Sequence, residues 1–201
     1  MKTLRILALA AMIGAGATAA LWTHEDSHAQ AAADPVAARI REAVAGETPK
    51  LLQSLKELTA IESGSLDLEG LARAEAWITQ RLKAAGMSIE SIPMRAPADH
   101  LLLKGATLGN AVYGRLTGTG TKKVLLIAHM DTVYPRGMGA KQPFRIDGDR
   151  AYGLGISDDK GGVALVLHTV ELLNALGSSD YAELGVLINA DEEIGSPGSG
   201  A

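Results

Sequence analysis

The chain has 201 residues, of which 47% are hydrophobic but only 3% aromatic, and its formal net charge is −4. This length suits one domain whose core is mainly aliphatic, as in layered α/β proteins. Without a basic block no nucleic-acid partner is expected, and without cysteine disulfides and thiolate metal ligands are excluded.

The first residues predict a secretory signal peptide over residues 1–31. Two basic residues precede an apolar stretch from Ile6 to Leu21, and Ala29-Gln30-Ala31 has the pattern of a cleavage site. An uncleaved membrane anchor is the alternative, but the stretch is shorter than the ~20 residues that span a bilayer. We therefore expect a secreted or periplasmic protein that keeps no stable membrane span after cleavage.

Three helices are expected after the signal peptide. The first begins at Asp34-Pro35 and the second at Thr48-Pro49, because a capping side chain followed by proline is typical of a first turn. The third begins near Asp67 and ends at Gly86. Apolar stripes on these helices predict that they cover a sheet.

Strands alternate with helices in the rest of the chain. Residues 87–94 predict an edge strand, since Pro93 disfavours a central place, and residues 110–116 predict a second strand. Residues 123–128 are apolar after Lys123, which is typical of a strand buried on both faces of a mainly parallel sheet.

A short hairpin, a helix and another buried strand complete the pattern. Residues 144–152 contain a glycine turn between two short strands, residues 162–176 form an apolar helix, and residues 184–190 form a second fully buried strand. Together these elements predict an α/β fold with an open, mainly parallel sheet flanked by helices. Ligands of such sheets bind beyond the carboxyl ends of the strands.

Three polar clusters interrupt these apolar segments. His129 and Asp131 follow one buried strand, Asp158 and Asp159 precede the apolar helix, and residues 191–193 are three acids that follow the other buried strand. One imidazole and several carboxylates at one edge of a sheet are ligands for a divalent metal. They point to hydrolysis by a metal-activated water.

Spacing suggests how each cluster contributes. His129 and Asp131 lie two apart, so their side chains point the same way and Asp131 can fix the imidazole. Of the two aspartates at 158 and 159, one can face the site and bridge two cations while the other caps the helix or faces solvent. Glu192 and Glu193 diverge, so that one can bind a metal and its neighbour the reacting water. Taken alone, each cluster is also compatible with a satisfied histidine, a helix cap or solvated loop charge.

The motifs H-x-D-T, G-x-G-x-x-D-x-K-G-G and D-E-E-x-G-S, in this order, resemble those of the M20-type zinc metallopeptidases. That family includes glutamate carboxypeptidases, succinyl-diaminopimelate desuccinylase and aminoacylases. The chain is most similar to its secreted, folate-cleaving glutamate carboxypeptidases, and the resemblance covers residues 34–199. It implies a zinc-exopeptidase-like fold, a small peptide or acyl-amino-acid substrate, and two Zn²⁺ ions.

The resemblance also implies roles for single residues. His129 and Glu193 would each bind one zinc and Asp158 would bridge both, while Glu192 would be the general base and Asp131 would orient His129. The family's further acidic ligand, its C-terminal histidine, and the lid domain through which full-length members form homodimers have no counterpart among the 201 residues. We therefore expect residues 32–201 to be the N-terminal part of a catalytic domain, with little activity as given.

Several assignments stay open. The expected reaction is hydrolysis of an amide that releases a C-terminal glutamate or a similar amino acid. The alternatives are an N-acyl amino acid deacylase or dipeptidase of the same family, and a truncated domain without catalysis. Histidine and carboxylate ligands also accept cobalt or manganese in place of zinc.

Overall fold

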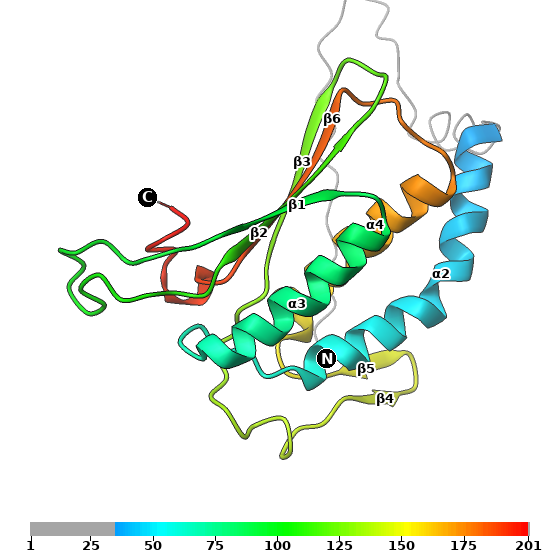
Figure 1. The fold of residues 1–201 in the computed structure, drawn as a ribbon. Helices are drawn as coiled ribbons and strands as arrows, with labels where there is room; N and C mark the ends of the chain where they lie inside the picture. Colours follow the sequence, from blue (N-terminus) through cyan, green and yellow to red (C-terminus); the bar gives the residue numbers. More distant parts are fainter. Residues whose placement is uncertain (1–34, 201) are drawn as a thin grey trace, which may run out of the picture. The chain divides into compact units, whose positions relative to one another are not determined.

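A computed structural model describes residues 35–200 (Figure 1). The expected signal peptide, residues 1–31, and the expected cap Asp34 lie outside the described residues. The chain divides after Glu42, and the fold described below is that of residues 43–200. None of the described helices is both long and apolar enough to cross a membrane.

The main sheet has four strands in the order β1-β2-β6-β3. Only β3 and β6 are parallel, whereas β1 pairs with β2, and β2 with β6, in antiparallel fashion. A separate antiparallel hairpin is formed by β4 and β5. The strands are β1 (Ser88–Ile92), β2 (Ala111–Thr117), β3 (Lys123–His129), β4 (Arg145–Asp147), β5 (Arg150–Tyr152) and β6 (Glu183–Asn189).

The open α/β sheet flanked by helices is confirmed, but the sheet is mixed rather than mainly parallel. A short connection after Thr117 reverses the chain, so that β3 runs opposite to β2. Because β6 enters between these two strands parallel to β3, it must be antiparallel to β2. The direction of β2 therefore accounts for the departure from the predicted pairing.

Burial differs sharply between the two apolar strands. In β6, Leu184, Val186 and Ile188 are no more than 3% exposed, as expected for a central strand. In β3, however, Leu125 is 51% and Ile127 62% exposed. The expectation that β3 is buried on both faces is wrong for the described sheet, because β3 lies at its edge and helices pack on the opposite face.

Two helices cover the sheet, α3 (Leu68–Ala84) against β1 and β2 and α4 (Gly161–Ala175) against β3 (Figure 1). Asp67 caps α3 by accepting the Gly70 N–H, and Gly86 follows the helix with φ of 88°, as the predicted start and stop require. The core combines helix and strand side chains, including Leu71, Ile78, Leu82, Val112, Val163, Leu167, Val170, Val186 and Ile188.

A single helix, α2 (Pro35–Ala60), replaces the two helices expected before residue 61. Proline inside a helix removes one backbone hydrogen bond and normally favours a break. Here side chains on both sides of Pro49 bind the same partner on α4. The Glu47 carboxylate lies 2.9 Å from His168 Nδ1, and Ser54 Oγ lies 2.9 Å from His168 Nε2. These tertiary contacts hold the helix through the proline.

Candidate active site

The candidate site lies where the parallel strands β3 and β6 end. His129 is the last residue of β3 and stands in register with Asn189, the last residue of β6. A short 3-10 turn, Glu192–Ile194, follows β6. The segment Ile156–Lys160, in which Asp158 and Asp159 have non-helical backbone angles, leads into α4. All three polar clusters therefore reach the carboxyl-end edge of the sheet, where ligands of α/β proteins bind.

His129 is the centre of this arrangement. Its side chain is 10% exposed, and its Nε2 lies 3.0 Å from Asp158 Oδ1 and 3.8 Å from Glu192 Oε2. On the other side of the ring, Nδ1 lies 3.3 Å from Asp131 Oδ1. One ring nitrogen thus faces the exposed acids while the other faces a buried carboxylate.

The acids around His129 control its protonation. Burial alone would lower the pKa of the imidazole, but the neighbouring carboxylates of Asp131 and Asp158 outweigh burial and raise the pKa to about 9. Without a bound cation the ring therefore carries a proton at neutral pH. Since metals bind the neutral ring, a cation would have to displace that proton.

Asp131 is fully buried and ties three segments together. Its Oδ2 accepts hydrogen bonds from Ser65 Oγ at 2.7 Å and from the Glu193 N–H at 3.0 Å, and its Oδ1 accepts one from the Glu192 N–H at 3.2 Å. Burial acts to raise the pKa of Asp131, but His129 and these donors outweigh it and the pKa is lowered. The ionised carboxylate therefore fixes both the imidazole and the turn that carries the glutamates.

The two neighbouring aspartates do different things. Asp158 keeps a side chain that is 74% exposed and directs Oδ1 at His129. Asp159 instead accepts the Gly162 N–H at 3.1 Å in the first turn of α4, and its other oxygen lies 3.4 Å from the backbone nitrogen of His129. Asp158 thus faces the site, while Asp159 holds the start of the helix against β3.

Glu192 and Glu193 diverge at the end of β6. Glu192 is half exposed and approaches His129, whereas Glu193 lines a cavity together with Thr132 and Tyr134. Burial, followed by the nearby charge of Asp158, raises the pKa of Glu193. Neighbouring carboxylates repel each other when both are ionised, and a bound divalent cation would neutralise this negative charge. The nitrogen and oxygen donors present here suit zinc.

Of the predicted metal ligands, His129 and Asp158 lie close together, 3.0 Å apart. Within residues 35–200, no three histidine, aspartate or glutamate side chains already form a group that could hold a metal ion. The structure brings His129 into contact with Asp131, Asp158 and Glu192, while Glu193 lies to the side. The metal set His129, Asp158 and Glu193 therefore stays a prediction.

Supporting residues near the site went unnoticed in the sequence. Ser65 and Ser63 belong to what reads as an ordinary turn, yet Ser65 binds Asp131 and Ser63 donates to the Met130 carbonyl at 2.7 Å. Lys160 is 2% exposed and donates to the Ile61 carbonyl at 2.6 Å, and its burial lowers its pKa to about 8. The one sequence signal for these supporting contacts is that residues 62–65 are small or polar.

A second support holds the loop after β6. Asp191 is fully buried and accepts the N–H groups of Gly198 and Ser199, at 2.7 and 3.0 Å, on one oxygen. Its other oxygen accepts the Ser199 hydroxyl at 2.6 Å. The first acid of the D-E-E cluster is thus a loop anchor rather than part of the exposed donor set.

Known proteins resemble this chain in sequence. Residues 125–201 match the model of peptidase family M20/M25/M40. Carboxypeptidase G2 of Pseudomonas sp. (strain RS-16) is 42% identical over 158 residues, which are 79% of this chain and 36% of that protein. The chain therefore spans little more than a third of the length of this relative.

Solved structures share the fold at lower identity. Human carnosine dipeptidase 1 matches with a TM-score of 0.66 and 22% identity over 79% of this chain and 35% of that one. An M20 family metallo-carboxypeptidase of Sulfolobus solfataricus matches with a TM-score of 0.58 and 22% identity, covering 73% and 32% of the two chains. These matches support the architecture described above.

Proposed function

Because this chain belongs to peptidase family M20/M25/M40, we propose that it carries the catalytic half-site of a metal-dependent amide hydrolase. The proposed reaction releases a C-terminal glutamate or a similar amino acid. The observation that carries the proposal is the meeting of three separate segments at one imidazole, with Asp158 Oδ1 at 3.0 Å and Glu192 Oε2 at 3.8 Å from His129 Nε2. In this proposal residues 32–201 are the N-terminal part of a catalytic domain.

His129, Asp158 and Glu193 are the residues that would hold the metal, and two zinc ions are the expected complement. A bound ion of this kind supplies Lewis acidity, which activates water and polarises the amide carbonyl. Asp131 is a positioning residue in this scheme, because its backbone carbonyl lies 3.2 Å and its carboxylate 3.3 Å from His129 Nδ1. Nε2 is thereby left directed at the exposed acids. His129 must lose a proton before it can serve as a ligand.

Glu192 is the proposed general base. Its side chain is half exposed, so water can reach it, and its backbone N–H is held by Asp131 Oδ1 at 3.2 Å. Its carboxylate would take a proton from the attacking water as the new C–O bond forms. It would then return that proton to the amide nitrogen as the C–N bond breaks, so that the amine leaves neutral.

The experiment compares metal binding with turnover. Zinc binding to the purified chain is measured by calorimetry for wild type, His129→Ala and Glu192→Gln, and hydrolysis is followed on N-acyl-glutamates, N-acyl-alanines and dipeptides. Glu192→Gln should keep zinc binding and lose at least about 100-fold in any hydrolysis rate, whereas His129→Ala should weaken zinc binding. Glu90→Gln, an exposed acid on β1, is the matched control and should change neither.

The same screen separates the alternatives. Preference for N-acyl-alanines or dipeptides would favour the deacylase or dipeptidase reading within the family. Zinc binding without any turnover would favour a metal-binding domain without catalysis. If the wild-type chain neither binds zinc nor hydrolyses any of these substrates, the proposal is overturned.

We also propose that the protein is exported, on the basis of the signal-like residues 1–31. Mass spectrometry of the protein recovered from the periplasm or medium of an expressing bacterium should find a new N-terminus near residue 32. Recovery of only the uncleaved chain, bound to membranes, would instead support the anchor.

A further inference from the structure

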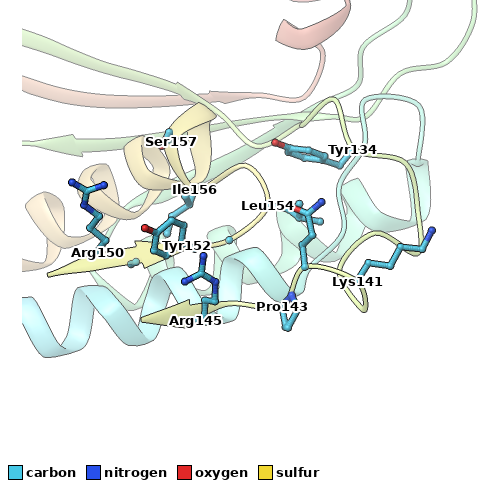
Figure 2. A pocket seen from close by; sticks show the side chains of 12 residues that line it. Tyr134, Lys141, Pro143, Arg145, Arg150, Tyr152, Leu154, Ile156 and Ser157 are labelled. Carbon is cyan, nitrogen blue, oxygen red and sulfur yellow. The ribbon is translucent and has the colours of Figure 1, made fainter. Parts of the chain in front are cut away.

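A cavity of about 730 Å³ opens beside the acid cluster. It lies between the segment that follows Thr132 and the β4–β5 hairpin, and Figure 2 shows the side chains that surround it. Ser157, the residue before Asp158, forms one end of its wall. Tyr134 borders both this cavity and the one lined by Glu193. The cavity therefore adjoins the segment that carries Asp158, although none of the clustered acids lines it.

The charge of the cavity is opposite to that of its neighbour. Arg145, Arg150 and Lys141 are among its lining residues, and within residues 35–200 no acidic side chain lines it. In Figure 2 the Arg145 guanidinium points into the space between Tyr152 and Leu154, whereas Lys141 extends away from the other labelled side chains. A negative cluster beside a positive cavity gives an elongated substrate a defined orientation.

Arg145 is held in place but keeps its donors available. Its guanidinium stacks over the Tyr152 ring at 3.7 Å from the ring centre, and the two residues are cross-strand partners in the hairpin. Its ion pair with Asp147 is long, 3.7 Å, and both side chains are more than half exposed, so this pair is weak. Among the described residues its Nε and Nη2 have no hydrogen-bond partner. A stacked guanidinium with an open edge suits bidentate binding of a carboxylate.

We infer that this cavity is a carboxylate subsite in which Arg145 binds the acidic side chain of the amino acid that the proposed reaction releases. The assignment rests on the proposed function, because it assumes that the scissile amide lies at the acid cluster. It explains why glutamate, rather than a neutral amino acid, would be the preferred leaving group. Tyr134, Tyr152 and Leu154 would contact the methylene groups that lead to this carboxylate.

Binding of two probes that differ only in this group tests the assignment. N-benzoyl-glutamate and N-benzoyl-glutamine are titrated into the metal-free full chain and followed by calorimetry or NMR. The wild type should prefer the glutamate probe, and Arg145→Gln should weaken its binding about tenfold while leaving the glutamine probe unchanged. Arg145→Lys, which keeps the charge but not the planar fork, should fall between the two.

Arg115→Gln is the matched control, since Arg115 is also about half exposed, has a similarly long ion pair, 3.8 Å to Glu183, and lies on β2 outside the cavity. It should bind both probes as the wild type does. No preference for glutamate in the wild type, or equal effects of Arg145→Gln on both probes, would overturn the subsite.

Failure of the subsite can be told from failure of the hydrolase. Arg145-dependent binding in a chain that neither binds zinc nor turns over substrate would keep the subsite and overturn only the proposed reaction. Turnover that requires Glu192 but does not depend on Arg145 would keep the proposed reaction and overturn the subsite.

Discussion

Asp131 joins three segments of the chain at the candidate site. It is fully buried, and donors from Ser65, Glu192 and Glu193 surround its two oxygens, with His129 Nδ1 nearby. A buried carboxylate of this kind is tolerated only because its hydrogen bonds are complete. Asp131 therefore affects both the stability of the fold and the proposed chemistry, since it accepts hydrogen bonds from the backbone of Glu192, the proposed base, and of Glu193, a proposed ligand.

Asp131→Asn should lower the free energy of unfolding by about 2 kcal/mol, because the amide NH₂ would face donors and leave buried groups unpaired. Urea unfolding followed by circular dichroism measures the change. Asp149→Asn alters a side chain that is 97% exposed and should leave stability unchanged. Equal stability of wild type and Asp131→Asn would mean that the carboxylate is not needed to hold the turn.

At the scale of elements, Asp67 joins the start of α3 to the loop after β3. It accepts the Gly70 N–H as a helix cap and pairs with the Arg136 guanidinium, whose Nε lies 3.0 Å from Asp67 Oδ2. Hydrogen bonding from Arg136, and then from the Gly70 N–H, lowers the pKa of Asp67 from 3.8 to about 2. The folded state therefore favours the ionised form.

This shift predicts a pH-dependent contribution to stability. Because the pKa is lower in the folded state, the ionised carboxylate stabilises the protein above roughly pH 4, and the effect disappears as the pH falls toward about 2. Asp67→Asn keeps a capping oxygen but loses the charge. It should cost about 1 kcal/mol at neutral pH and progressively less in acid.

Denaturant unfolding of wild type and Asp67→Asn at several pH values checks this expectation. Asp149→Asn again serves as the control, because its exposed carboxyl has no such helix end to cap. A difference between wild type and Asp67→Asn that stays constant from neutral to acid pH would show that the charge is not what matters.

At the scale of the whole molecule, the described fold leaves one sheet face uncovered at β3. Leu125 and Ile127 are adjacent on that face and more than half exposed, and β3 is also an edge strand. An exposed apolar edge strand is a template for pairing with another chain. The 201-residue chain should therefore self-associate.

Ile127→Lys should reduce that self-association severalfold, because a charge at the centre of the patch opposes sheet-to-sheet contact. Sedimentation velocity at increasing protein concentration measures it. Leu102→Lys changes a side chain that is 82% exposed in the loop between β1 and β2, outside β3, and should have little effect. Monomeric wild-type protein at all concentrations would contradict this reading of β3.

Elements with strong local signals were predictable. The helix that begins after Asp67, the hairpin around Gly148 and the buried strand after residue 183 all lie where capping, glycine turns and apolar runs place them. The break at Pro49 and the double burial of β3 were wrong for a shared reason. In both cases the structure depends on segments far along the chain. Contacts with His168 hold α2 through Pro49, and the position of β3 at the edge of the sheet decides how much of it is buried.

The sequence by itself determined which side chains can meet, because His129 and the acids at 158, 192 and 193 follow from strand ends and a helix start that local patterns locate. Only the tertiary structure decided how they meet, because it places β6 between β2 and β3 and Ser65 against Asp131. It also places Arg145 in a cavity that no acidic side chain of the described residues lines. Local patterns act through neighbouring residues, whereas strand order and buried hydrogen bonds join segments tens of residues apart. Several strand orders and side-chain contacts are compatible with the local patterns, and long-range packing determines which of them forms.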